Sequence, residues 1–273
     1  MRPRLHLVYA ASVTVALCIG CGGAAGPKTV KSRVERLDVN AMLLEHATGH
    51  SRNLHRPDEE LTDLELQRRK ARGKERHALS RRLAVAHMFE AEQALGLKAT
   101  RRHQRAAIKL AAEAAKVMKD PWDRAELAFV RMWSVYRMGR PTAAKVVSHF
   151  IKRHRVSAEL VVVAWLVQAE LDYGRRRFKQ AERSYRYVVA MAPHPLYGLS
   201  LYRTAQCYEE LDRIEDMHAA FTQIVQLGCA EDERSVHDDV LSNAAAQERE
   251  KLVRIADGRL FPKRCAPKPP EEG

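Results

Sequence analysis

Residues 162–195 read VVAWLVQAELDYGRRRFKQAERSYRYVVAMAPHP, and their pattern decides the fold because it recurs on both sides. Its apolar and small positions are Trp165, Ala169, Phe178, Ala181, Tyr185, Val188 and Pro193. A shift of 36 residues leads to Leu201, Ala205, Ile214, Met217, Phe221, Ile224 and Cys229. A shift back by 37 leads to Ala128, Met132, Pro141, Ala144, Ser148, Ile151 and Val156. Turn-forming residues divide each unit, which predicts repeated pairs of helices.

This pattern resembles the tetratricopeptide repeat (TPR), whose signature runs Trp, Leu-Gly, Tyr, Ala, Phe, Pro. Residues 162–195 match best, 198–231 follow with Tyr208 also in place, and 125–158 are degenerate. Two substitutions depart from the family, since Met217 replaces a small residue and Ser148 replaces an aromatic one. The period is also slightly longer than that of the family. A generic helical bundle with accidental self-similarity is the alternative interpretation.

The predicted fold class is all-α, a helix-turn-helix, TPR-like solenoid that ends in a C-terminal capping helix. Gly and Pro are scarce between residues 58 and 192, where good helix formers dominate, and alternating runs typical of strands are absent. The predicted organisation is a signal peptide (1–20), a lipid-anchored tether with a weak helix (21–57), degenerate helical hairpins (58–121), the repeats (122–231; units 125–158, 162–195 and 198–231), the capping helix (232–257) and a Pro-rich tail (258–273).

The N-terminus reads MRPRLHLVYAASVTVALCIGCGGAAGPK over residues 1–28 and is typical of a targeting segment. Two arginines precede the apolar stretch from Leu7 to Ile19, which is shorter than the roughly 20 residues of a membrane-spanning helix. The segment resembles a bacterial lipoprotein signal with Cys21 as the lipid-modified residue. Cys18 stands where that signal usually has Leu, and an ordinary secretory signal or an uncleaved anchor are the alternatives. The resemblance implies a cell-envelope protein, anchored in the outer membrane and facing the periplasm.

The net charge of +13 is unevenly distributed. Residues 31–200 hold 34 Lys and Arg against 19 Asp and Glu, whereas residues 201–273 hold 10 against 15. A basic body is typical of a protein with an acidic partner. Export argues against nucleic acid, so anionic lipid headgroups or an acidic protein surface are favoured. An arginine-rich coding bias of the genome would produce the same composition.

Three further cysteines follow the proposed lipidation site, and an odd number leaves at least one free thiol in an oxidising compartment. Cys229 and Cys265 either form a disulfide or stay free, whereas Cys207, next to Tyr208, is predicted to be a buried small apolar residue. No cofactor and no metal site is predicted. The helical pair His46 and His50 lacks further ligands, and so does the run His237-Asp238-Asp239.

The TPR resemblance implies that the first helix of each unit lines a concave groove that binds protein partners. The positions that the family presents there are Phe129, Trp133, Tyr136, Arg137, Leu166, Glu170, Tyr173, Tyr202, Arg203, Gln206 and Glu209. Leu166 and Glu170 replace the residues with which some family members hold a terminal carboxylate, so an extended apolar or mixed segment is the expected ligand. Alternatively, the aromatic side chains pack against neighbouring units or against the N-terminal helix.

The function expected from these features is that of a membrane-tethered, non-enzymatic scaffold for envelope proteins. The alternative is an envelope enzyme, or a regulatory subunit of one, that acts in cell-wall metabolism. No Gly-rich phosphate loop and no GxSxG motif occurs in the sequence. A pocket where acidic or histidine side chains converge would favour the enzyme.

Replacing Cys21 by serine should abolish acylation and release the protein from membranes, because the hydroxyl cannot take the thiol's place in the modification. Metabolic labelling with an alkyne fatty acid, followed by membrane fractionation, measures both effects. Cys18→Ser is the matched control and should keep the label. Undiminished label in the Cys21 variant would contradict the anchor assignment.

Overall fold

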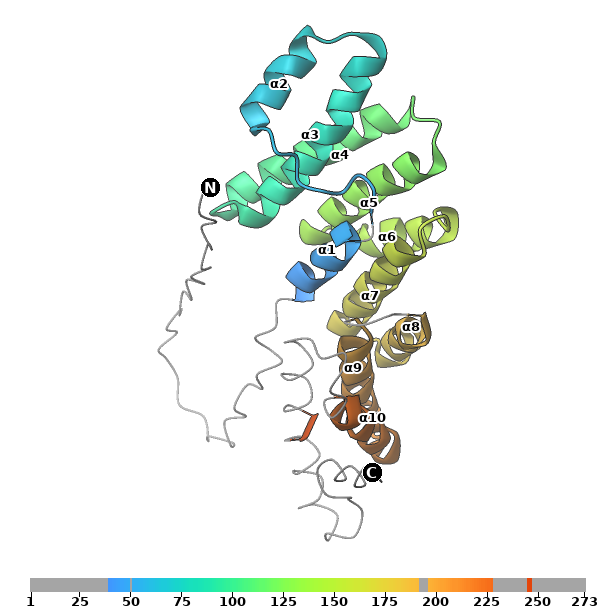
Figure 1. Cartoon of the computed structure of the whole chain (residues 1–273). Helices are drawn as coiled ribbons and strands as arrows, with labels where there is room; N and C mark the ends of the chain where they lie inside the picture. The colour runs from blue at the N-terminus through green and yellow to red at the C-terminus, as the bar shows by residue number, and fades with distance from the viewer. Residues whose placement is uncertain (1–38, 50, 192–195, 228–244, 247–273) are drawn as a thin grey trace, which may run out of the picture. The chain divides into compact units, whose positions relative to one another are not determined.

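A computed structural model describes residues 39–49, 51–191, 196–227 and 245–246. These residues form α-helices and no strands (Figure 1). The helices are α1 (Val39–Gly49), α2 (Leu61–Lys70), α3 (Gly73–Gln93), α4 (Leu97–Ala115), α5 (Pro121–Arg137), α6 (Ala143–Arg153), α7 (Ala158–Gly174), α8 (Phe178–Met191), α9 (Leu196–Glu210) and α10 (Ile214–Leu227). None of the described helices is long and apolar enough to cross a membrane. Because the described elements are all α-helices, the predicted all-α fold class is confirmed.

Several predicted features lie outside the described residues. They are the signal peptide, Cys21, the cysteines Cys229 and Cys265, the tail, and all of the capping helix except Ala245 and Ala246. Within the described part, the acidic residues 58–60 directly precede α2. The predicted helical hairpins of 58–121 correspond to α2, α3 and α4, the last of which begins at Leu97, directly after Gly96.

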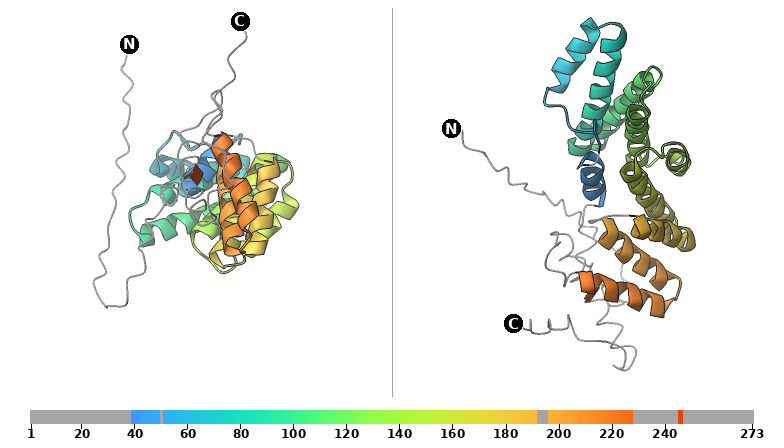
Figure 2. Two further views of the ribbon diagram at one scale, coloured as in Figure 1. Left: turned by 90° about the horizontal axis from the view of Figure 1, so that it is seen from below. Right: turned by 45° about the vertical axis from the view of Figure 1, so that its right-hand side comes forward.

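From α2 to α10, each helix packs against the next one along the chain. Figure 2 shows this arrangement for α9 and α10, which lie side by side. Met132, Ala169 and Ala205 occupy equivalent positions of the three units and are all fully buried, although methionine is larger than alanine. Tyr185 and Phe221 are also buried, as expected for side chains that fill the space between helices. A helix pair of this kind buries its apolar face only by stacking on its neighbours.

The turns inside the three units share one backbone conformation. Gly139, Arg176 and Asp212 have φ values of 62°, 58° and 57°, in the left-handed region. The same shifts of 37 and 36 residues that relate the sequences relate these three positions. In each turn the following N–H bonds the carbonyl five residues back, from Arg140 to Val135, Arg177 to Asp172 and Arg213 to Tyr208. This is the Schellman pattern that ends a helix, and it makes the three hairpins alike.

Side-chain caps fix where two of the first helices begin. Asp120 accepts hydrogen bonds from the backbone N–H groups of Trp122 (2.7 Å) and Asp123 (3.1 Å), and Pro121 supplies the first helical residue of α5. Ser157 accepts a bond from the N–H of Leu160 (3.3 Å) at the start of α7. These caps satisfy donors that would otherwise be unpaired at the helix ends.

Replacing Gly139 by alanine should lower the free energy of unfolding by about 1 kcal/mol, because an L side chain is strained at this positive φ. Gly174→Ala is the matched control: both glycines have open space around an added Cβ, but Gly174 is the last residue of α7 and lacks a positive φ. The control should be neutral or slightly stabilising. Urea unfolding followed by circular dichroism gives the comparison, and equal losses in both variants would contradict the turn assignment.

Candidate functional site

The residues expected to line a groove divide into three groups in the structure. Phe129, Trp133, Leu166 and Tyr202 are buried, with at most 2% of each exposed. Tyr136, Glu170, Tyr173, Arg203 and Gln206 are half-buried, and Arg137 and Glu209 are exposed. The structure therefore corrects the exposure expected for the first group. Those four side chains belong to the core.

The N-terminal helix explains part of this burial. α1 packs against α7 and contacts α5, where the hydroxyl of Tyr136 donates to Asn40 Oδ1 at 2.9 Å (Figure 1). The segment after α1 is held by Glu126, which is 2% exposed and accepts bonds from Ser51 Oγ and from the Asn53 side-chain amide (2.6 Å). The described N-terminal segment thus covers first helices of the repeat, as the packing alternative proposed.

The half-buried members of the predicted groove bind one another. Arg203 Nε donates to Glu170 Oε1 at 3.0 Å, and the Tyr185 hydroxyl donates to the same oxygen at 2.9 Å. Arg203 also donates to Gln206 Oε1 and lies 5.6 Å from the centre of the Tyr173 ring. Burial raises the pKa of Tyr173 to about 12. This cluster joins α7, α8 and α9 and satisfies polar groups that the family would present to a ligand.

Trp133 is fixed in a similar way at the other end of this face. Its indole N–H donates to Glu92 Oε1 at 3.1 Å, and Arg137 binds both oxygens of the same carboxylate. Cys207 is fully buried, which confirms the sequence-based expectation for this residue. Burial raises the pKa of its thiol to about 12 and keeps it in the unreactive protonated form.

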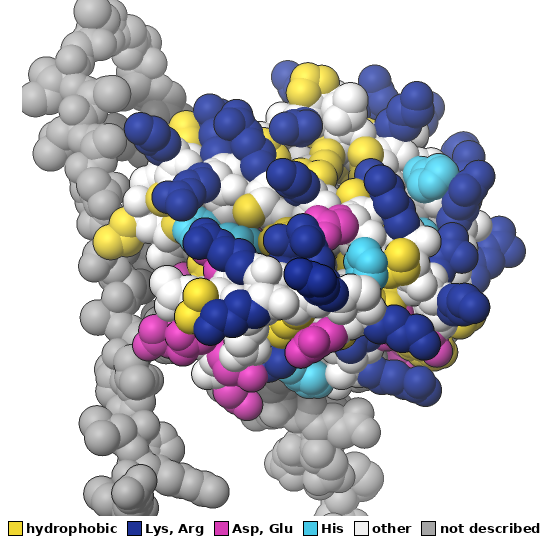
Figure 3. All heavy atoms as spheres, turned by 90° about the horizontal axis from the view of Figure 1, so that it is seen from above, with side chains coloured by type: hydrophobic (Ala, Val, Ile, Leu, Met, Phe, Trp, Pro, Cys, Tyr) yellow, Lys and Arg dark blue, Asp and Glu magenta, His cyan; other side chains and the backbone are white. Residues whose placement is uncertain are grey.

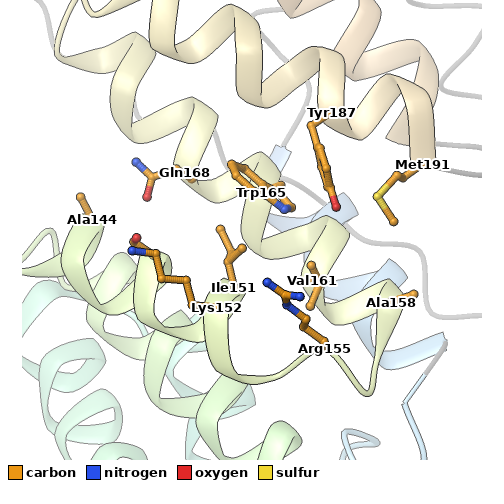
Figure 4. A pocket seen from close by; sticks show the side chains of 11 residues that line it. Ala144, Ile151, Lys152, Arg155, Ala158, Val161, Trp165, Gln168, Tyr187 and Met191 are labelled. Carbon is orange, nitrogen blue, oxygen red and sulfur yellow. The ribbon is translucent and has the colours of Figure 1, made fainter.

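An open hollow lies elsewhere, between α6 and α8 and above α7 (Figure 4). We call it the α6–α8 hollow; its volume is about 540 Å³, and the residues that characterise it are Ser148, Lys152, Arg155, Trp165, Tyr187 and Met191. Trp165 and Tyr187 stand against each other with ring centres 4.7 Å apart. Figure 4 shows them on one side of the hollow, with Lys152 and Arg155 on the other.

The hollow arises from a departure in the repeat. Ser148 occupies the position that Tyr185 and Phe221 fill in the other two units. Those aromatic side chains are buried, whereas Ser148 lines the open space. In the described structure α6 packs on α5 and α7. The position that carries a buried aromatic side chain in the other two units thus carries a small polar one at the edge of the hollow.

The hollow combines an apolar wall with unsatisfied polar groups. Tyr187 and Met191 are 41% and 43% exposed, which is unusual for such large apolar side chains side by side. In the described part of the chain, Lys152 and Arg155 have no acidic side chain within ion-pair distance. Gln168, which also lines the hollow, donates to Asp172 at 2.8 Å, but its buried Oε1 lacks a hydrogen-bond donor. Apolar walls with few polar groups are typical of binding sites.

Sequence reasoning did not select this site, although it noted the substitution at Ser148. Within the described residues, no group of three or more His, Cys, Asp or Glu is placed to hold a metal ion. No protein-family model matches the chain, and neither the curated proteins nor the solved structures contain a significant match. The resemblance to the TPR family therefore rests on the repeated sequence pattern. The shared conformation of the three turns agrees with that pattern.

Replacing Trp133 by alanine should lower the free energy of unfolding by about 3–5 kcal/mol, because it leaves a large cavity in the core. It also leaves the Glu92 carboxylate without the indole donor. Trp122→Ala on the same helix is the control and should cost much less, since Trp122 is only half-buried. Denaturant unfolding measures both. A small loss at Trp133, together with weakened partner capture, would restore the original groove assignment.

Proposed function

We propose that the protein is a lipid-anchored scaffold of the bacterial cell envelope, built from TPR-like helical repeats, and that it binds a protein partner. The sequence supports the anchor through Cys21 and the outer-membrane, periplasm-facing location through its resemblance to lipoprotein signals. The all-helical stacked fold supports the repeat assignment. The observation that carries the binding function is the α6–α8 hollow, with its exposed aromatic wall and two cations.

The chemistry of the hollow favours one kind of ligand. Trp165, Tyr187 and Met191 offer an apolar wall against which a large side chain of a partner gains burial. Aromatic residues and arginine carry most of the binding energy in protein interfaces. Lys152 and Arg155 would pair with carboxylates beside that side chain. The ligand that fits best is therefore a partner segment in which an apolar residue is followed by Asp or Glu.

This binding mode replaces the groove that the family resemblance implied. The four most apolar groove residues are buried, and Glu170 and Arg203 are paired with each other. A partner at those positions would have to break existing contacts. At the hollow it would instead cover exposed side chains such as Tyr187 and Met191.

Ser148→Tyr should abolish partner capture, because it restores the aromatic residue of the other units and fills the hollow. A photoreactive phenylalanine at Tyr187 in growing cells should crosslink a discrete envelope protein, and the same probe at exposed Leu66 on α2 should not. The tyrosine variant should lower the crosslink yield by at least about tenfold, in line with the loss of a buried anchor. Ser148→Ala is the size-matched control and should retain the crosslink.

The charged rim is tested separately. Lys152→Glu with Arg155→Glu should also weaken the crosslink, whereas Lys179→Glu with Arg183→Glu, exposed cations on α8 outside the hollow, should not. Circular dichroism must show intact helices in every variant. A crosslink that survives Ser148→Tyr in folded protein would contradict the assignment of the hollow.

A further inference from the structure

One face of α4 carries a stripe of cations. Between residues 97 and 112 the chain has five basic side chains and no acidic one. We call them the α4 stripe; they are Lys98, Arg101, Arg102, Arg105 and Lys109, and all are exposed. At 100° per residue they fall within about 100° of the helix circumference and extend about 16 Å along its axis. The opposite face is buried in the core through Ala107, Ala111 and Ala114.

The stripe is not neutralised within the described structure. None of its side chains lies within ion-pair distance of a described carboxylate. Glu113, the nearest acid along α4, is already bound by Arg68 at 2.7 Å and approached by Arg76 at 3.8 Å. Figure 3, viewed from above the α2–α4 side of Figure 1, shows Lys and Arg dominating that face with few acidic side chains.

This arrangement opposes the stability of the helix. Like charges three and four residues apart repel each other on a helix surface. The stripe also begins at the N-terminus of α4, whose macrodipole favours anions, and there is no acid in the first turn and no side-chain cap. By contrast, α5 and α7 are capped by Asp120 and Ser157. Departures from the sequence preferences that stabilise a helix are expected mainly at functional or strained sites.

Exposed leucines adjoin the stripe. Leu95 is 98% exposed and Leu97 is 65% exposed, at the turn that leads into α4. They line one shallow surface depression, of about 680 Å³, together with Lys98, Arg102 and Arg105. The surface thus presents apolar side chains and unpaired cations in the same place. That combination is typical of helices that lie on a membrane, where leucines enter the acyl boundary and cations meet the headgroups.

We propose that the α4 stripe with Leu95 and Leu97 is a docking surface for anionic phospholipid headgroups. Each cation near an anionic bilayer contributes about 1 kcal/mol, or roughly fivefold in affinity, and the stripe offers several cations on one face. The two leucines favour a bilayer over an acidic protein, because a bilayer accepts protruding apolar side chains without a matching pocket. The proposal needs neither the α6–α8 hollow nor an acyl chain, so it stands apart from the proposed function.

The test is binding of the full chain with Cys21→Ser to vesicles of phosphatidylcholine, alone or mixed with phosphatidylglycerol, measured by co-sedimentation. The protein should prefer the anionic vesicles and lose that preference at high salt. Lys98→Gln, Arg102→Gln and Arg105→Gln together should weaken binding roughly a hundredfold. The matched triple, Arg140→Gln, Arg175→Gln and Lys179→Gln, removes the same charge from exposed positions elsewhere and should bind like the parent. Any affinity of the apolar N-terminal segment is common to all variants.

A separate pair of substitutions tests the two leucines. Leu95→Ser with Leu97→Ser should weaken vesicle binding several-fold while its salt dependence stays unchanged. Loss of binding through unfolding is controlled by circular dichroism, and the glutamine triple should stabilise α4 by removing repulsion. The proposal is overturned if the two triples bind alike, if neutral and anionic vesicles bind alike, or if the protein binds polyglutamate but not anionic vesicles. Ser148→Tyr should leave vesicle binding unchanged, which separates this test from that of the hollow.

Discussion

The repeated hairpins depend on one backbone constraint, the left-handed residue that ends the first helix of each unit. At Gly139, Arg176 and Asp212 the chain leaves the helix in the same direction and closes the same backbone bond five residues back. The second helix must then return along the first, which brings residues such as Ala169 and Ala181 into the core. Because the turn is the same each time, the apolar faces meet in the same register, and stacking can continue from α5 to α10. Arginine and aspartate adopt the strained conformation at two of these turns, so packing outweighs a local cost of about 1 kcal/mol.

The binding site that we propose lies where the repetition fails. The second and third units place Tyr185 and Phe221 in equivalent buried positions, and the first unit places Ser148 there. The backbone of the first unit still follows the common turn, so the helices do not collapse to fill the missing volume. The space remains open beside Trp165 and Tyr187, which a closed repeat would cover. In the proposed function, the binding site results from the omission of one side chain while the surrounding frame stays the same.

The sequence predicted the helices and turns because these depend on local spacing. It did not predict which aromatic residues are exposed, since that depends on a distant segment. α1 has a weak apolar pattern, yet it packs on α7 and contacts α5, more than 80 positions along the chain. Likewise, nothing in the local sequence around Trp133 reveals that Glu92 binds its indole. The only sequence signal for the α6–α8 hollow was Ser148, a small residue where the other units have an aromatic one. The cations of the hollow come from a loop and a helix end, where the repeat pattern does not extend.

The excess of arginine has two explanations that composition alone does not separate, a coding bias or a basic binding surface. The pattern of ion pairs distinguishes these two explanations. Many arginines are structural: Arg68 binds Glu113, Arg81 binds Asp123, Arg137 binds Glu92 and Arg203 binds Glu170, each linking different helices. A coding bias would scatter the remaining cations over the exposed positions of all helices. Exposed cations such as Arg140, Arg175 and Lys179 are scattered in this way, but five others align on one face of α4 without a described acidic partner and beside two exposed leucines. Such alignment destabilises the helix that carries it, and a bias without function gives no reason for the chain to keep that cost in one place.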